Sequence, residues 1–232
     1  MEYENIHGAT FLERPNRFIA HCLVNGREVV AHVKNTGRCG EILVPGTTVY
    51  LEHAPSPARK TDWSLISAQK GDLLINIDSQ APNQVVHEAL LAGRLLDEDI
   101  TYLKREAKYG SSRMDFYMET VTGRRIFMEV KGVTLETQGH VLFPDAPTQR
   151  GAKHVRELAA AIQEGYEAML ILVVQLSPAA YFTPNHATDP QFALALKEAA
   201  AAGVKIHAFD CETTPESLKL NTEIPVRLER ES

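Results

Sequence analysis

Two carboxylates and a lysine stand at the ends of two neighbouring apolar stretches. Asp115 opens the first stretch, and Glu129 and Lys131 close the second. Aspartate and glutamate supply the hard oxygen ligands that Mg²⁺ prefers, and a lysine beside them can orient a water or neutralise charge on a phosphate. These residues therefore predict a catalytic metal-dependent phosphodiester site, in which Asp115 and Glu129 are the ligands of Mg²⁺ or Mn²⁺.

This chemistry requires the three side chains to share one face of a hairpin. Glu129 and Lys131 share a face because side chains alternate along a strand. A two-residue turn at residues 122–123 would put Asp115 on the opposite face, whereas a three-residue loop at 122–124 would pair it with Lys131. We therefore expect the odd-length loop or an equivalent bulge. The alternative is a surface hairpin with ordinary charges.

Basic side chains accompany the hairpin and the helix start that follows it. The helix start carries Arg150, Lys153 and His154, and backbone N–H groups at such a start favour anions. These three residues and Arg113 are predicted to contact nucleic-acid phosphates, with Lys153 and His154 on the exposed side of the helix. The alternative is a solvated helix start in which Lys153 pairs with Glu157.

Glu106 is a candidate third acid, because sites of this kind often recruit one from a preceding element. A surface glutamate beside Lys104 and Lys108 is the alternative. Asn83 and Glu88, in the preceding predicted helix, are weaker candidates of the same sort.

The bulk composition restricts the class of protein. The chain has 232 residues, 44% of them hydrophobic, and a net charge of −6; this fits a globular protein and argues against one that coats nucleic acid by bulk charge. There is no run of 18 apolar residues and no secretory signal. Three scattered cysteines suit reduced thiols. We expect a cytoplasmic protein with no membrane partner.

Residues 10–78 have an all-β pattern. Strands are expected at residues 18–24, 28–33, 47–53, 63–69 and 73–77, with a tight hairpin at Asn25 and Gly26. About five short strands predict a small barrel, and the five-stranded oligonucleotide-binding (OB) barrel has this size. Another small barrel or a sandwich is the alternative.

From about residue 80 the pattern becomes one of helices and strands. Helices are expected at residues 82–96, 150–164 and 190–202, the last ending at Gly203, with a hairpin at 114–130 and strands at 169–176 and 204–209. This order predicts an α/β sandwich around a mixed sheet. We therefore expect two domains, residues 1–79 and 80–232.

Several motifs resemble the sugar fermentation stimulation protein A family. They are Asn-Thr-Gly at 35–37, Pro-Gly at 45–46, Tyr-Gly-Ser-Ser-Arg-Met-Asp-Phe at 109–116, Glu-Val-Lys-Gly-Val-Thr-Leu at 129–135, and Phe-Pro-Asp-Ala-Pro-Thr-Gln-Arg-Gly-Ala-Lys-His-Val-Arg-Glu-Leu at 143–158. The resemblance spans nearly the whole chain. It implies an N-terminal OB-fold barrel, a C-terminal PD-(D/E)XK nuclease-like domain, DNA binding, and a regulatory link to sugar, notably maltose, utilisation.

By position, the resemblance places Asp115, Glu129 and Lys131 on the nuclease-like motif. Met114 stands where the motif's name has proline, and this substitution does not touch the metal chemistry. Arg38 with Cys39 departs from the small and apolar residues expected after Asn-Thr-Gly.

Three functions remain open from the sequence. The first is a DNA-binding regulatory protein, with RNA as an alternative ligand. The second is an active Mg²⁺-dependent nuclease, favoured by the intact acidic set because a pure binder gains nothing from carboxylates that face phosphates. The third is a protein-interaction module. Binding to nucleic acid that weakens with salt would favour either of the first two over the third.

Overall fold

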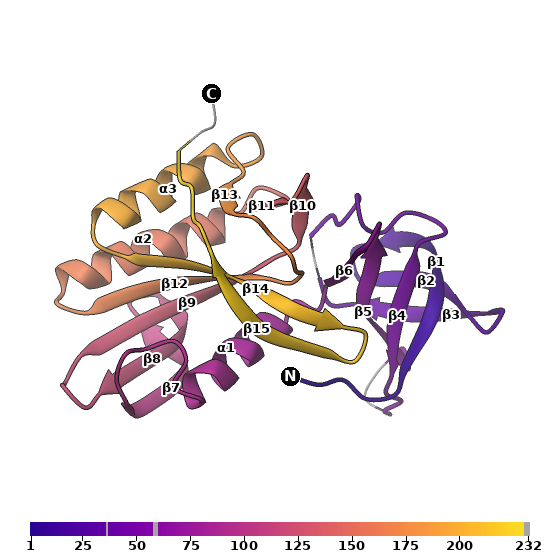
Figure 1. The fold of residues 1–232 in the computed structure, drawn as a ribbon, viewed down its shortest axis with the longest axis horizontal. Helices are drawn as coiled ribbons and strands as arrows, with labels where there is room; N and C mark the ends of the chain where they lie inside the picture. Colours follow the sequence, from indigo (N-terminus) through magenta and orange to yellow (C-terminus); the bar gives the residue numbers. More distant parts are fainter. Residues whose placement is uncertain (36, 58–59, 230–232) are drawn as a thin grey trace.

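The chain forms a β-barrel followed by a mixed sheet with helices on both faces (Figure 1). The structure, a computed structural model, describes residues 1–35, 37–57 and 60–229. Among the helices of these residues, none is long and apolar enough to cross a membrane.

Six strands build the N-terminal sheet. They are β1 (Ile6–Asn16), β2 (Ile19–Val24), β3 (Arg27–Val33), β4 (Thr48–His53), β5 (Trp63–Lys70) and β6 (Leu73–Asn76). β1 pairs with both β2 and β4, and a parallel pairing of β3 with β5 closes a five-stranded barrel. The sixth strand, β6, pairs antiparallel with β5. Asn25 and Gly26 have φ of 50° and 77°, which confirms the predicted tight hairpin.

The sequence pattern missed β1 and counted β6 in its place. β1 contains Gly8 and Pro15 and exposes many of its side chains, so it lacks the β-branched alternation that marks a strand. It nevertheless completes the barrel, because Ala9 and Phe11 point into the core and its backbone is paired on both sides.

The C-terminal sheet has the order β15-β14-β12-β9-β8-β7. Its strands are β7 (Ile100–Tyr109), β8 (Ser112–Thr120), β9 (Arg125–Val133), β12 (Glu167–Val174), β14 (Lys205–Thr214) and β15 (Ser217–Ile224). β9, β12 and β14 run parallel and the outer strands antiparallel, which confirms the mixed sheet. A small sheet beside it contains β10 (Leu135–Thr137), β11 (His140–Phe143) and β13 (Phe182–Pro184). The edge strands β7 and β15 were not predicted, since their exposed polar residues obscure the alternation.

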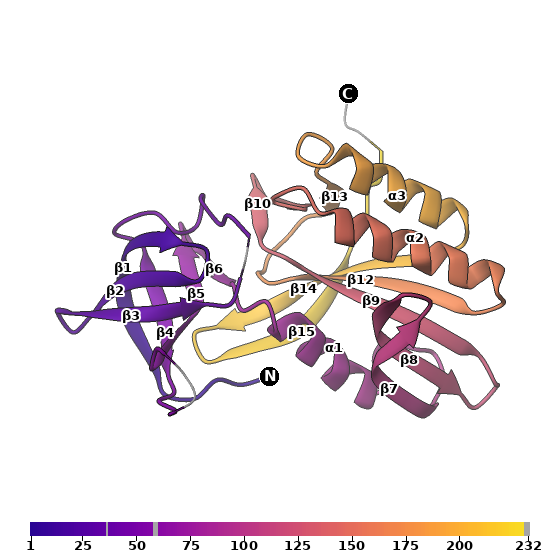
Figure 2. The same cartoon turned by 180° about the vertical axis from the view of Figure 1, so that it is seen from behind.

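Helices cover both faces of this sheet (Figure 2). α1 (Ala81–Leu91) packs on Met128 and Val130 of one face, whereas α2 (Gln149–Gln163) and α3 (Pro190–Ala201) lie on the face of Phe127. α1 is shorter than predicted because Gly93 takes a positive φ of 67°. The N–H groups of residues 93 and 94 then cap the carbonyls of residues 90 and 89, a Schellman ending.

The starts of α2 and α3 are fastened to each other. The Thr148 hydroxyl accepts a hydrogen bond from Gly151 N (3.0 Å) and caps α2, and the Asp189 carboxylate accepts from Phe192 N (2.9 Å) and caps α3. The same carboxylate accepts from Thr148 N at 2.7 Å. The first turn of α2, which carries the predicted basic residues, is therefore held in a fixed place.

A buried polar network joins the two sheets. Asp78 is fully buried, and its Oδ2 accepts from Lys34 Nζ at 2.6 Å. Gln175, at the end of β12, donates through Nε2 to Asn76 Oδ1 and Asp78 O, each at 3.0 Å, and its carbonyl accepts from Asn76 N at 2.9 Å. The chain leaving the barrel is thus bonded to the centre of the second sheet.

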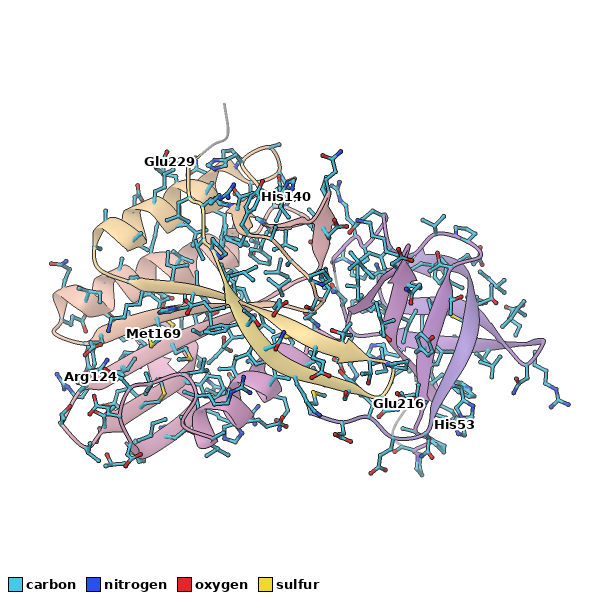
Figure 3. The ribbon with its side chains drawn as sticks, in the orientation of Figure 1. His53, Arg124, His140, Met169, Glu216 and Glu229 are labelled. Atoms are coloured by element: carbon cyan, nitrogen blue, oxygen red, sulfur yellow. The ribbon has the colours of Figure 1, made fainter. Side chains whose placement is uncertain are left out.

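The first three residues pair with β15 rather than with the barrel. Glu2 forms an antiparallel bridge with Ser217, and Tyr3 N donates to Glu216 O at 2.8 Å. His53 N of the barrel donates to Asn5 O, so Glu216 and His53 lie at the same end of the junction (Figure 3).

An ion cluster around Arg124 holds the hairpin end of β8 and β9, at the end of the molecule away from the barrel (Figure 3). Its Nε and Nη2 donate to the two carboxylate oxygens of Glu167 at 2.6 and 2.8 Å, and Nη1 donates to Asp97 and Glu98. The Arg124 guanidinium, helped by Lys205, lowers the pKa of Glu167 to about 2.

We expect Glu167→Gln to destabilise the fold near neutral pH and to have little effect in acid. A carboxyl whose pKa falls from 4.5 to about 2 on folding contributes stability that is fully present above the higher value and lost as pH falls through the lower one. Urea unfolding at about pH 6 and about pH 2 checks this, with Glu212→Gln, an exposed carboxylate, as the control. An equal loss at both pH values would contradict the expectation.

Candidate functional site

The β8–β9 hairpin places Asp115 and Glu129 on the same face of the sheet. The ladder ends one pair before Asp115, and its register puts Asp115 level with Glu129. The hairpin closes through a three-residue loop at 121–123, bounded by a hydrogen bond between residues 120 and 124. The predicted odd loop length is confirmed. The predicted loop position, residues 122–124, is wrong by one residue, and the predicted pairing of Asp115 with Lys131 is wrong as well. The observed register differs from the predicted one by two residues. Because side chains alternate with a period of two, all three side chains still share a face.

Asp115 lies where the backbone pairing of β8 with β9 stops, and here its carboxylate accepts a hydrogen bond from the backbone of β9. Oδ2 accepts from Val130 N at 2.7 Å, and Oδ1 accepts from Asn83 Nδ2 of α1 at 2.7 Å. Asn83 therefore belongs to the site, although its sequence signal was weak. Glu88, the other weak candidate, instead binds the amino group of Met1 at 2.6 Å.

Glu129 is only 2% exposed, and its two oxygens have different surroundings. Oε1 accepts from Lys131 Nζ and from His154 Nδ1, the latter at 2.5 Å. Oε2 is buried and has no hydrogen-bond partner among the residues that the structure describes. A carboxylate oxygen held from water without a partner is costly, so a cation bound to this atom would offset that cost.

The surroundings of the two carboxyl groups shift their pKa values in opposite directions. Burial raises the pKa of Asp115 to about 6, and the charge of Glu129 adds to this rise. Burial acts in the same direction on Glu129, but the His154 hydrogen bond and the Lys131 charge outweigh it and lower the pKa of Glu129. Glu129 is therefore ionised at neutral pH, and Asp115 is the carboxyl that titrates near neutrality.

The donor set fits a hard divalent cation. Within residues 1–35, 37–57 and 60–229, no group of three or more histidine, cysteine, aspartate or glutamate side chains could hold a metal alone. Mg²⁺ does not require such a group, since it keeps several waters and is bound by one or two carboxylates together with substrate phosphates. Asp115 and the unpartnered oxygen of Glu129 are the two carboxylates available for such a site, and their role as metal ligands stays a prediction.

His154 occupies a different place from the one predicted. Its expected position on the exposed side of α2 is wrong, because the ring is 5% exposed and bonded to Glu129. A carboxylate only accepts, so Nδ1 carries the proton and Nε2 can accept from Arg150 Nε across a long 3.5 Å contact. His154 therefore orients the Glu129 carboxylate. This role could not be predicted, because His154 was expected on the exposed side of α2, whereas it lies with Val155 on the buried face.

The remaining basic candidates are exposed beside the acidic residues. Arg113, Arg150 and Lys153 line a cavity of about 590 Å³, as does His154. Lys153 also lies 3.7 Å from Glu157, so the alternative i,i+4 pair is present as well. Contact of these residues with phosphate stays a prediction.

Glu106 lines the same cavity and lies level with Asp115 in the β7–β8 register. Its φ of 51° is unusual for a residue other than glycine. Its exposed side chain makes no hydrogen bond or ion pair within the described part of the chain, and its role as a third acid stays a prediction.

Comparisons with known proteins agree with this architecture. The family model described as the SfsA N-terminal OB domain matches residues 12–77, and the one described as the sugar fermentation stimulation protein RE domain matches residues 80–217. These matches confirm the predicted oligonucleotide-binding barrel and the nuclease-like second domain.

Whole-length relatives are similar as well. The sugar fermentation stimulation protein homolog of Clostridium beijerinckii is 51% identical, covering 98% of this chain and 100% of the relative. The Desulfitobacterium hafniense homolog is 49% identical, covering 98% and 99%. The solved structure of Pyrococcus furiosus SfsA in complex with Ca²⁺ is 31% identical, with a TM-score of 0.87 and 98% of both chains covered.

Proposed function

The chain belongs to the sugar fermentation stimulation protein family, and we propose that it is a nucleic-acid-binding protein whose acidic site holds a divalent cation against a backbone phosphate. The observation that carries this proposal is the buried, unpartnered Oε2 of Glu129 next to Asp115. Because the net charge is −6, strand binding has to come from local groups. Arg113, Arg150 and Lys153 are exposed beside the acids and supply such charge.

Asp115 and Glu129 would hold the cation, Mg²⁺ or Mn²⁺. When bound, it would supply charge neutralisation at the phosphate and a fixed place for an attacking water. Lys131, whose ammonium lies against Glu129, would orient that water or neutralise charge on the phosphate. The relative from Pyrococcus furiosus was solved in complex with Ca²⁺, which supports a divalent cation in this fold.

We propose DNA as the ligand, with RNA as the alternative, and the cytoplasm as the place of action. The family's name ties its members to sugar fermentation, and we carry this over as a regulatory role in sugar, notably maltose, utilisation. In this proposal the regulatory effect follows from the binding of nucleic acid.

Phosphodiester cleavage is the second candidate function. The complete set of Asp115, Glu129 and Lys131 favours it, because carboxylates facing a phosphate weaken binding unless a cation lies between them. His154 also holds Glu129 in one orientation, which catalysis needs more than binding does.

A paired assay separates the two. Wild type and Glu129→Ala are incubated with Mg²⁺ or Mn²⁺ and labelled single- and double-stranded DNA and RNA, and binding and cleavage are scored together. Metal-dependent cleavage that the variant loses establishes the nuclease. Binding without cleavage in either protein leaves the binding function alone, and an absence of binding to every nucleic acid refutes both.

We expect cation affinity to rise as pH is raised through about 6. Below that value Asp115 is protonated and neutral, because burial raises its pKa to about 6, and a neutral carboxyl is a poor ligand. Calorimetric titration of Mn²⁺ between about pH 5 and pH 8 checks this. Asp115→Asn should bind weakly at every pH. A wild-type affinity that does not change over the range would contradict the expectation.

A further inference from the structure

A second cavity, of about 760 Å³, lies where the barrel meets the second domain. The β10–β11 hairpin stands beside the barrel at this junction (Figure 1, Figure 2). The barrel lines the cavity with Arg14, Arg17 and Arg38, and the second domain with Gly132 and residues 142–148. This volume is within the roughly 300–1,000 Å³ that small-ligand sites occupy.

Arg14 shapes the barrel wall of this cavity. Its guanidinium donates to four backbone carbonyls, those of Arg17, Asn35, Gly37 and Arg38, at 2.7–2.8 Å. The turn at Arg17 and the segment that contains Gly37 and Arg38 are therefore fixed to each other. Arg14 Nε is buried and has no hydrogen-bond partner among the described residues, so one donor remains unused in the wall.

Arg17 and Arg38 extend from these fixed loops and are exposed. Within the described residues, neither guanidinium makes a hydrogen bond or an ion pair. Asp145 is the acid across the cavity, and its Oδ2 already accepts from Arg38 N at 2.9 Å. Three arginines thus stand against one engaged carboxylate in a chain of net charge −6. The planar fork of arginine suits phosphate oxygens.

Two residues that line the cavity, Gly132 and Thr148, are sequence neighbours of residues in or beside the acidic site. Gly132 directly follows Lys131 and gives the cavity a floor of bare backbone. Thr148 lines it from the other side and caps α2, and two residues later Arg150 lines the cavity beside the acids. A strand that passes from the acidic site along Gly132 and the start of α2 would therefore reach the arginines of the barrel.

We propose that this cavity is a second phosphate subsite, in which Arg17 and Arg38 bind the backbone of the strand whose phosphate reaches Asp115 and Glu129. The inference rests on the proposed function. It makes the barrel and the nuclease-like domain two parts of one track. A strand is favoured over free phosphate because two basic cavities adjoin at the start of α2, where Thr148 lines the first and Gln149 and Arg150 line the second.

Strand length and salt dependence test this proposal. Binding is measured in Ca²⁺ for a trinucleotide and for a strand of about 20 nucleotides, longer than the roughly 4–16 that one such barrel covers. The double variant Arg17→Ala/Arg38→Ala should bind the long strand about tenfold more weakly, with a salt slope smaller by about 1.4, since each single-strand phosphate contact contributes about 0.7. Trinucleotide binding should not change. Arg27→Ala, an exposed arginine at the β2–β3 turn, is the matched control.

Three results would overturn the proposal. The first is a long-strand affinity that the double variant retains. The second is an equal loss in Arg27→Ala. The third is protection of the wild type, but not the double variant, from thermal unfolding by inorganic phosphate, with long-strand binding equal in both. Failure of the proposed function gives a different result: Glu129→Gln would leave cation binding intact whatever the arginine variants do.

Discussion

Glu129→Gln should abolish divalent-cation binding at the acidic site while leaving the fold intact. One oxygen of Glu129 already accepts from Lys131 and His154, so the amide oxygen of glutamine takes that position. Its NH₂ group then points to the place of the unpartnered Oε2 and repels a cation. The loss in Mn²⁺ affinity should exceed the roughly 10–100-fold cost of removing an outer-shell partner, and any cation-dependent cleavage should be lost with it.

Calorimetric titration with Mn²⁺ measures this effect, and the cleavage assay measures its consequence. Glu212→Gln removes one exposed carboxylate from β14 and should behave as wild type. Thermal unfolding of both variants shows whether the fold is kept. An affinity in Glu129→Gln equal to that of wild type would remove Glu129 from the site.

Gly132→Ala should destabilise the protein by about 2–4 kcal/mol, the sum of an overpacking cost and of disturbed buried hydrogen bonds. A Cβ at position 132 would lie 2.4 Å from Gln175 Oε1 and 2.8 Å from Pro82 Cγ. Gln175 is 1% exposed and holds Asn76 and Asp78 at the barrel exit. It therefore cannot yield without breaking the bonds that join the two sheets.

Thermal unfolding is the measurement for Gly132→Ala, and a loss of this size corresponds to a decrease of roughly 4–16 °C in Tm for a chain of this length. Gly8→Ala is the matched control, because a Cβ there meets nothing within 4 Å. Gly132→Ala should cost less in a Gln175→Ala background than in the wild type, because the obstructing oxygen is then absent. Equal melting of Gly132→Ala and Gly8→Ala would contradict this account of the junction.

The acidic hairpin could be predicted in detail because its constraints are local. Strand alternation put Glu129 and Lys131 on one face, and the required parity of the loop put Asp115 with them. The position of the loop differed by one residue, because Gly123 is the strong turn residue there and both the predicted loop, 122–124, and the observed one, 121–123, contain it. The end of α3 was also predicted, because a glycine with a positive φ, here Gly203, ends a helix locally.

The partners of the acids could not be predicted, because they depend on packing between distant elements. Asn83 reaches Asp115 only because α1 crosses the sheet at that point, and His154 reaches Glu129 only because Asp189 fixes the start of α2. β1 was missed for a related reason. Its sequence is poor in strand signals, and closure of the barrel stabilises it.

The most direct test of the account is the anomalous scattering of Mn²⁺ in a crystal of this protein. The account predicts one peak about 2.1 Å from carboxylate oxygens of Asp115 and Glu129, with Oε2 as the glutamate ligand. A crystal in which Mn²⁺ binds only elsewhere, with Glu129 Oε2 hydrogen-bonded to an ordered water instead, would contradict it.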